Sequence, residues 1–340
     1  MKMNILVTGG CGFIGCNFIR YLLEEYPNSN VVNLDKLTYA GNPSSLKDLQ
    51  KNESRYTFVH GDIADRELVS RLILDFGLET IVNFAAETHV DRSIDDPSEF
   101  ITTNVQGTYN LMECARKLEV SRFVHISTDE VYGSLGPSGV FTEDTPLAPN
   151  SPYSASKAAA DLMARSYYKT YGFPVIITRC SNNYGPYQFP EKLIPLVYLR
   201  ALENRPVPVY GRGENIRDWI YVRDHCRGVA LAMEKGSPGA VYNFGGDAEK
   251  KNIDVVRSIL DFVGKSQELI TFVNDRPGHD LRYAMDYSLA RRELGWEPRT
   301  SFSDGLERTL TWYAENTEWI QGVQTGAYRE FMDKWYKERC

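Results

Sequence analysis

The sequence has few cysteines and histidines, and neither is spaced as a metal site or a disulfide framework requires. The six cysteines are Cys11, Cys16, Cys114, Cys180, Cys226 and Cys340. No two of them form a C-x-x-C pair, and their spacing suits neither zinc nor a set of paired bridges. We therefore expect no metal, and reduced structural thiols in a cytoplasmic protein.

Long apolar runs and dense clusters of positive charge are also missing. No run of about 18 or more apolar residues is present, so a membrane span is not expected. Met1 leads almost directly into the strand-like segment Asn4–Thr8, without the pattern of a secretion signal. The net charge is −7, and no group of lysines and arginines is dense enough for a nucleic-acid footprint. An anionic ligand would therefore need a local basic site, with no membrane or nucleic acid as partner.

The composition is that of a globular protein, with 42% apolar and 24% charged residues. Its 340 residues exceed a typical single domain, so one large domain or two coupled domains are expected. No internal repeat and no low-complexity segment is present.

The first half of the chain alternates short apolar segments with helical patterns. The predicted strands are Asn4–Thr8, Val31–Asp35, Tyr56–His60, Thr80–Ala85, Arg122–Ser127 and Pro174–Arg179. The predicted helices are Phe13–Glu25, Asp65–Phe76, Pro97–Leu118 and Pro152–Tyr171, the last capped by Ser151. Continuous apolar strands separated by helices predict an α/β protein with a Rossmann-type, doubly wound parallel sheet.

The pattern changes after about Ser181. Turn residues at 182–186 are followed by short helices and isolated strands such as Pro206–Tyr210 and Val241–Phe244. We expect residues 1–180 to form the domain of this sheet and residues 181–340 to form mainly a smaller, discontinuous mixed α/β domain. A helix over Asp218–Lys235 is expected to return to the sheet, within a segment near 218–240.

Gly9, Gly12 and Gly15 form a G-x-x-G-x-x-G turn between the first strand and the first helix. Without side chains, such a turn lets backbone N–H groups approach a pyrophosphate at the helix N-terminus. Asp35 ends the second strand, 20 residues after Gly15, where a carboxylate can accept hydrogen bonds from ribose hydroxyls. This favours NAD over NADP, although the neighbouring Lys36 and Thr38 weaken the preference slightly. Residues 1–180 are therefore expected to be the NAD-binding domain, and residues 181–340 mainly the substrate domain.

Asp62 and Ile63 follow the third strand. The Asp62 carboxylate could accept from an adenine amino group while Ile63 covers the ring, or Asp62 could simply cap the helix that begins near Arg66. The sequence leaves both readings open.

Tyr153 and Lys157 are four residues apart on a predicted helix and therefore share a face. A nearby ammonium should lower the pKa of the phenol, so that Tyr153 can remove a proton from a sugar hydroxyl as hydride leaves the same carbon.

Thr128, Asp129 and Glu130 follow a strand, at the sheet edge where ligands of such folds bind. Burial and like charge could raise the pKa of one carboxyl and leave the other ionised, giving an acid and a base. Thr128 could bind the substrate hydroxyl. The alternative is an ordinary turn or helix cap.

With these motifs the chain resembles the extended short-chain dehydrogenase/reductase superfamily, and within it the dTDP-glucose 4,6-dehydratases. The resemblance runs from Asn4 to about Trp312 and includes the segments 85–93, 127–133, 153–157, 179–186, 215–219 and 275–280. It implies that NAD is bound and recycled. Tyr153 would deprotonate the glucose C4 hydroxyl, Glu130 would remove the C5 hydrogen, and Asp129 would protonate the departing C6 hydroxyl. Hydride would then return to C6, as in a hydro-lyase whose product most commonly feeds rhamnose synthesis.

The resemblance also implies further contacts. Those to the cofactor are Phe13, Ile14, Ala85, Ala86 and Asn183. Those to a nucleotide-diphosphate sugar are His89, Thr128, Asn182, Asn183, Glu191, Lys192, Tyr210, Arg217, Asn252, His279 and Arg282. Ordinary readings remain open for three of them, with Arg217 paired to Asp218, Tyr210 packed in the core and Lys192 solvated. By analogy, the helices Pro97–Leu118 and Pro152–Tyr171 imply a homodimer.

Three rival functions remain. A UDP-glucose 4,6-dehydratase would share the Thr-Asp-Glu triad. Its substrate carries uracil in place of thymine, and the one missing methyl group allows a discrimination of only about 1–3 kcal/mol. A nucleotide-sugar 4-epimerase would not need the Asp129–Glu130 pair. A non-catalytic NAD-binding regulator would need none of the acid, base and phenol groups.

Overall fold

The computed structural model describes residues 3–324. Within them, no helix is long and apolar enough to cross a membrane. Cys340 lies outside this range, and the other five cysteines are buried and free, as expected.

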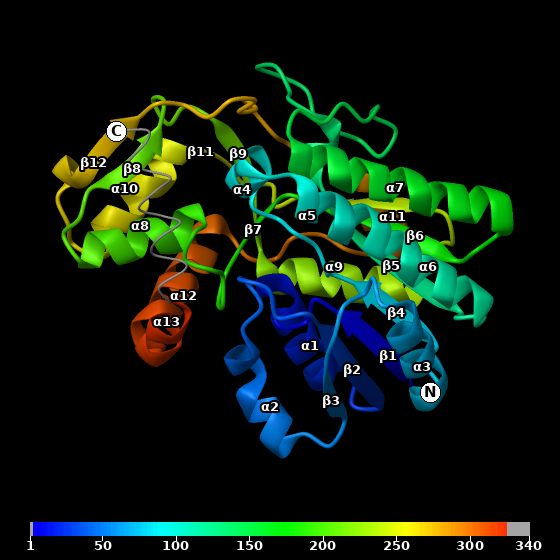
Figure 1. Ribbon diagram of the computed structural model, residues 1–340. Coiled ribbons are helices and arrows are strands. Elements are labelled where there is room, and N and C mark those ends of the chain that lie inside the picture. The colour runs from blue at the N-terminus through cyan, green and yellow to red at the C-terminus, as the bar shows by residue number, and fades with distance from the viewer. Residues whose placement is uncertain (1–2, 325–340) are drawn as a thin grey trace.

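A seven-stranded parallel sheet forms the centre of the molecule (Figure 1). Its strands, in spatial order, are β10 (Val241–Phe244), β6 (Val175–Cys180), β5 (Arg122–Thr128), β4 (Thr80–Asn83), β1 (Met3–Thr8), β2 (Ser29–Asp35) and β3 (Tyr56–His60). The order reverses between β1 and β4, which places a ligand crevice at their carboxyl ends. The predicted doubly wound fold is therefore confirmed.

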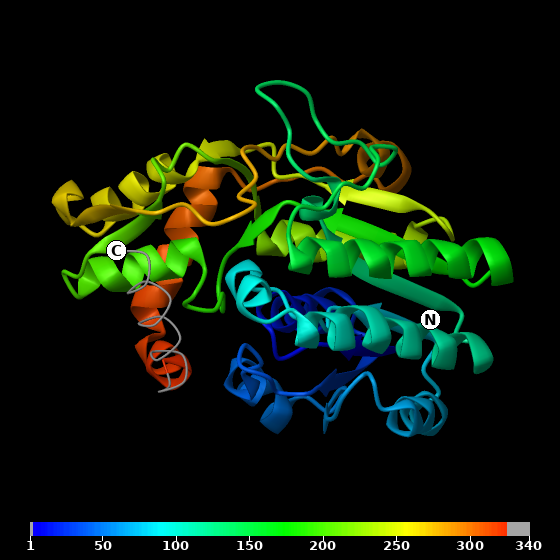
Figure 2. The same cartoon turned by 45° about the horizontal axis from the view of Figure 1, so that its top comes forward.

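Helices cover both faces of this sheet because alternate strand residues point to opposite sides. Ile5 and Val7 pack toward one face and Leu6 toward the other. The first face is covered by α1 (Phe13–Glu25), α9 (Val222–Lys235) and α11 (Ser288–Leu294). The second is covered by α3 (Arg66–Phe76), α6 (Thr108–Lys117) and α7 (Pro152–Tyr171). In Figure 2, α6 and α7 lie side by side along the second face.

Short elements connect the strands near their carboxyl ends. They are η1 (Pro43–Leu46), α2 (Lys47–Asn52), α4 (Val90–Asp95), α5 (Ser98–Phe100), the π-helical η2 (Ile101–Gly107) and the 3-10 turn η3 (Asp129–Tyr132). The predicted helix Pro97–Leu118 therefore consists of α5, η2 and α6, and its middle is π-helical. Ser151 caps α7 through a reciprocal bond with Ser154, as predicted.

A smaller unit with its own apolar core lies beside the carboxyl edge of the sheet (Figure 1). It contains β7 (Asn182–Tyr184), α8 (Leu193–Leu202), β8 (Val207–Tyr210), β9 (Ile216–Tyr221), β11 (Glu249–Lys251), α10 (Asn252–Phe262), η4 (Gln267–Leu269), β12 (Ile270–Val273), α12 (Phe302–Glu315) and α13 (Thr317–Val323). β9 pairs with β7 and β11, and β8 pairs with β12.

Two local predictions are wrong. Asp218 does not begin a helix, because residues 216–221 form β9 and α9 starts only at Val222. Residues 182–184, predicted as a turn, form the short strand β7. In both places, pairing with segments distant in the sequence outweighs the local pattern. The chain does return to the main sheet, where α9 packs against α1 and β10 pairs with β6.

Candidate active site

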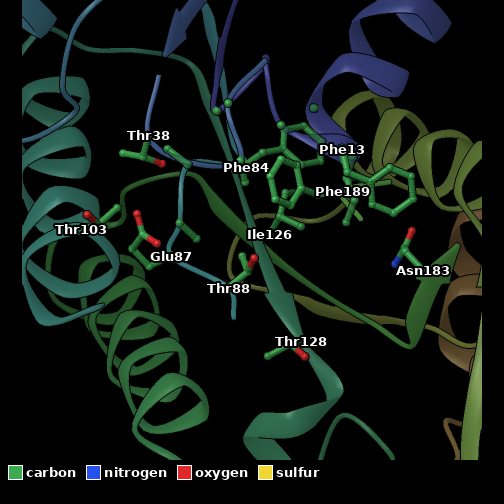
Figure 3. Close-up of a pocket in the computed structure, with 18 of the residues that line it drawn as sticks. Phe13, Thr38, Phe84, Glu87, Thr88, Thr103, Ile126, Thr128, Asn183 and Phe189 are labelled. Atoms are coloured by element: carbon green, nitrogen blue, oxygen red, sulfur yellow. The ribbon is translucent and has the colours of Figure 1, made fainter. Parts of the chain in front are cut away.

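One pocket opens at the carboxyl ends of the central strands and extends toward the smaller unit (Figure 3). All residues expected to contact the cofactor line it: Gly9, Gly12, Phe13, Ile14, Gly15, Asp35, Lys36, Thr38, Asp62, Ile63, Ala85, Ala86, Tyr153, Lys157 and Asn183. Thr128, Asp129 and Glu130 line the same pocket. The glycine turn, the phenol–lysine pair and the two carboxyls, far apart in the sequence, thus face one space.

The glycine turn is so tight that two of its positions leave no room for a side chain. Gly9 has a φ of +67°, and a Cβ there would lie 2.6 Å from the amide nitrogen of Ala85. A Cβ on Gly15 would overlap the carbonyl oxygen of Gly9. Gly12 caps α1 without a side chain, so the first amides of α1 are left for a ligand. This arrangement fits a pyrophosphate.

Asp35 is held by the backbone around it. Its carboxylate accepts from the amides of Cys11 and Leu37, each over 2.8 Å. Burial raises its pKa, and these two hydrogen bonds oppose the rise. The carboxylate is therefore fixed at the end of β2, where a ribose would bind.

Asp62 does not cap α3, because Asp65 does so by accepting from the amide of Leu68. The helix-cap reading of Asp62 is therefore wrong. Asp62 instead forms an ion pair with Lys36 over 2.9 Å and accepts from the amide of Ala64. Both members of the pair line the pocket.

Tyr153 and Lys157 lie on one face of α7 and are buried, 7% and 4% exposed. The Lys157 ammonium donates to the carbonyl oxygen of Ile126 over 2.6 Å. Burial, and next the charge of Glu130, raises the pKa of Tyr153 well above its usual value. The expected lowering of the pKa of Tyr153 is therefore wrong for the protein groups alone, because burial and the nearby carboxylates raise it, and a hydrogen bond to Thr128 only opposes the rise.

Asp129 and Glu130 follow β5 in η3 and differ in their surroundings. Asp129 is 2% exposed, and its pKa is raised well above the usual value by burial and then by Glu130 and Asp218. Burial also raises the pKa of Glu130, but Arg276, Arg217 and Lys192 oppose it. The cations therefore favour charge on Glu130, whereas burial and the neighbouring carboxylates favour a proton on Asp129.

Thr128 combines a local role with a position in the pocket. Its hydroxyl accepts from the amide of Glu130 and donates to the Asp129 carboxyl, each over 3.2 Å. Figure 3 shows its side chain at the end of β5. The threonine thus orients the two carboxyls that follow it.

The predicted substrate residues divide into two groups. Asn182, Asn183, Glu191 and Lys192 line the pocket together with Thr128, whereas His89, Tyr210, Arg217, Asn252, His279 and Arg282 do not. Lys192 donates to the carbonyl of Thr88 over 3.1 Å, so the solvated reading is wrong. Glu191 is buried beside His89 and Arg92, and burial raises its pKa to about 7.

The remaining members lie in the smaller unit. Arg217 donates to the carbonyls of Ile216 and Asp280 and stacks on Tyr283, while Asp218 accepts from Ser181 and two backbone amides. The alternative in which Arg217 pairs with Asp218 is therefore wrong.

Tyr210 is also not a core residue, because it is partly exposed and donates to Asp91 over 2.9 Å. Its ring packs edge-on against His279. Asn252 starts α10, and its amide donates to Asn215. Arg282 forms a two-bond ion pair with Glu249, so its charge is already balanced within the protein.

Several residues near the chemistry were not predicted. Glu87, Phe189 and Thr103 line the pocket, and Figure 3 labels their side chains. Arg276 is partly buried and faces Glu130 from a distant loop. The motifs containing Glu87 and Arg276 were recognised, so the signal was present, whereas Phe189 and Thr103 carry no chemical signature in the sequence.

Comparison with known proteins agrees with this geometry. The family model described as GDP-mannose 4,6 dehydratase matches residues 6–309. A dTDP-glucose 4,6-dehydratase of Salmonella typhimurium is 48% identical, covering 99% of this chain and 100% of its own length. The enzyme of that name from Xanthomonas campestris is 51% identical, covering 95% of this chain and 97% of itself.

A solved structure shows the same architecture. DesIV, a dTDP-glucose 4,6-dehydratase of Streptomyces venezuelae determined with NAD and TYD bound, is 51% identical and superposes with a TM-score of 0.92. The match covers 95% of this chain and 100% of that one. The chain therefore belongs to the GDP-mannose 4,6-dehydratase family and, within it, to the dTDP-glucose 4,6-dehydratases of the extended short-chain dehydrogenase/reductase superfamily.

Proposed function

We propose that this chain is an NAD-dependent hydro-lyase that converts dTDP-glucose into dTDP-4-keto-6-deoxyglucose and water. The observation that carries the proposal is the Asp129–Glu130 pair, which faces the same pocket as Tyr153 and the glycine turn. Hydride transfer alone needs only a base and a cofactor. Loss of water also needs an acid and a second base, and this site has both.

The cofactor pocket fits NAD. The glycine turn and the first amides of α1 suit the pyrophosphate, and Asp35 suits an unphosphorylated ribose. When bound, NAD supplies the hydride chemistry, as acceptor from the sugar C4 and as donor to C6.

The protein groups supply the proton transfers. Tyr153, as a phenolate stabilised by the Lys157 ammonium, removes the proton of the C4 hydroxyl and becomes a neutral phenol. Glu130 then removes the C5 hydrogen, which the 4-keto group has made acidic. Asp129, protonated because of its burial, gives its proton to the departing C6 hydroxyl, so that water leaves. After C6 is reduced, Glu130 returns a proton to C5.

The substrate contacts are part of the same proposal. Asn182, Asn183, Glu191 and Lys192 would contact the sugar and nucleotide, and their position in the pocket wall supports this. Arg217 would contact the diphosphate from the smaller unit, and the carbonyl groups that hold its guanidinium support this. His89, Tyr210, Asn252, His279 and Arg282 remain predicted contacts.

A direct assay tests the activity. The purified chain is incubated with dTDP-glucose or UDP-glucose without added reductant, and products are followed by mass and by the alkaline absorbance of a 4-keto sugar. We expect the loss of one water from dTDP-glucose, with a higher kcat/KM than for UDP-glucose. Recovery of both substrates unchanged would overturn the proposal.

We also propose a homodimer formed through α6 and α7. Four large hydrophobic side chains on the η2, α6 and α7 segments are exposed: Ile101 (56%), Tyr109 (37%), Leu162 (56%) and Tyr171 (57%). Such a set favours a protein contact. Leu162→Arg should give a monomer by light scattering, whereas Leu74→Arg on α3, also exposed, should not. If both variants match the native mass, this interface is wrong.

The buried free thiols support a cytoplasmic location.

A further inference from the structure

A buried polar cluster lies behind the Tyr153–Lys157 face of α7. It consists of Asp161 on α7, His125 on β5 and Arg179 on β6, which are 1%, 0% and 5% exposed. None of the three lines the pocket, so none is placed to touch a substrate or cofactor. Buried charged groups are costly unless they are paired, so this cluster requires a physical explanation.

The Asp161 carboxylate joins three elements. One oxygen accepts from the Arg179 guanidinium over 2.8 Å, and the other lies 3.5 Å from Nε2 of His125. Arg179 also donates to the hydroxyl of Tyr132 in η3, the segment that carries Asp129 and Glu130. One carboxylate therefore connects α7 to β5 and β6 and, through Arg179, to η3.

These contacts lie next to the hydrogen bond that holds Lys157. The ammonium donates to the carbonyl of Ile126, the residue directly after His125. Asp161 is four residues after Lys157, on the same face of α7. The cluster thus faces both Lys157 and the strand position that binds it.

The charges around Lys157 also indicate that Asp161 acts on this lysine. The titratable groups that face Lys157 or its partner phenol are Asp161 on α7, His125 on β5, Cys180 on β6, and Asp129 and Glu130 on η3. Arg179 on β6 faces Asp161 and His125. Burial lowers the pKa of Lys157 to about 8, and the charge of Asp161 is the largest opposing influence. Burial keeps His125 neutral, with its pKa well below the usual value, and keeps Cys180 a thiol, with its pKa near 12.

We propose that Asp161 is a positioning residue for Lys157. Its carboxylate, fixed by Arg179 and facing His125, keeps the lysine charged and directed at Ile126, so that the ammonium can stabilise the Tyr153 phenolate. The inference rests on the proposed function, because it assigns Asp161 a part in the first proton transfer.

The test is the pH profile of Asp161→Asn, which keeps the shape of the side chain and removes its charge. Lys157 must be protonated to act, so activity falls as pH rises through its pKa. Without the carboxylate we expect this alkaline limb to move about one pH unit lower, a roughly tenfold loss of kcat at pH 9 that shrinks toward pH 7. KM for dTDP-glucose should stay within about twofold, since Asp161 does not line the pocket.

Two matched variants separate charge from packing. Asp161→Glu retains the carboxylate and should keep the native alkaline limb even if kcat falls uniformly. His125→Gln replaces one neutral group by another and should also leave the limb in place. If Asp161→Asn gives no folded protein, the smaller Asp161→Ser carries the same test.

The outcomes are distinct. A native limb in Asp161→Asn, or an equal shift in His125→Gln, would overturn the role of Asp161 while the native enzyme stays active. If the native chain does not dehydrate dTDP-glucose at all, the proposed function itself is wrong.

Discussion

Lys36 and Asp62 form an ion pair 2.9 Å long between the residues that follow β2 and β3. The pair lies beside Asp35 in the pocket. Lys36 and Thr38 weaken the preference for NAD over NADP that the sequence predicts, because a neighbouring cation could tolerate a 2′-phosphate. In the structure Asp62 balances that charge, and the preference for NAD is strengthened.

Removing this balance should improve NADP binding. We expect Asp62→Asn to raise the affinity for NADP⁺ relative to NAD⁺ by up to about fivefold, since a half-exposed pair contributes roughly 0–1 kcal/mol. Binding of each dinucleotide to protein stripped of cofactor can be measured by calorimetry. Asp65→Asn is the control, because asparagine still caps α3 and Asp65 lies outside the pocket. An unchanged NADP⁺/NAD⁺ ratio in Asp62→Asn would show that Lys36 does not contribute to the selection.

Glu130→Gln should separate oxidation from elimination. Tyr153 and Lys157 remain, so oxidation at C4 should continue, while removal of the C5 hydrogen loses its base. We expect kcat for dehydration to fall by about 10²–10⁴-fold and reduced cofactor to accumulate on the enzyme. Rapid mixing with dTDP-glucose, followed by near-ultraviolet absorbance, checks this. Dehydration at the native rate would rule out the proposed role of Glu130.

Asp129→Asn should stabilise the folded chain at neutral pH while it abolishes elimination. Because burial raises the pKa of Asp129, the folded state binds this proton more tightly than the unfolded state does. Stability is therefore lost as pH rises above the unfolded value of about 4. Removing the carboxyl should increase the free energy of unfolding by on the order of 1 kcal/mol at pH 8, and by nothing from this source at pH 3. Urea titrations at the two pH values measure the difference, and an equal effect at both would contradict the assignment.

Gly15→Ala should damage both folding and cofactor binding. Alanine normally favours a helix by roughly 0.5–1 kcal/mol over glycine. Here its methyl group would overlap the Gly9 carbonyl, and we expect a net loss of about 1–3 kcal/mol. Thermal unfolding with and without NAD⁺ is the measurement. Gly136→Ala, where a Cβ would meet nothing within 4 Å, should behave like the native chain.

The sequence was most informative where the signal is local. The glycine turn, the cap at Ser151 and the helix α7 depend on residues a few positions apart, and all three are found as predicted. The parallel sheet was also predictable, because its apolar strands are separated by helical patterns.

The errors arise from contacts between distant residues. Residues 218–221 were predicted as the start of a helix, but pairing with β7 and β11 makes them part of the strand β9. The pKa of Tyr153 depends on how deeply α7 packs and on which carboxyls face it. The motif that contains Arg276 was recognised, but it lies far along the chain from Glu130, and no local pattern indicates that the two side chains face each other.

The order of the strands has a consequence for engineering. The chain leaves the main sheet after β6, builds β7 to β9 beside it, and returns to add α9 and β10 before it leaves again. A fragment ending at residue 181 would expose one edge of β6 and the α1 surface that α9 covers. Exchanging the smaller unit for one that recognises another sugar would therefore need several crossover points, each placed where the chain passes between the two units.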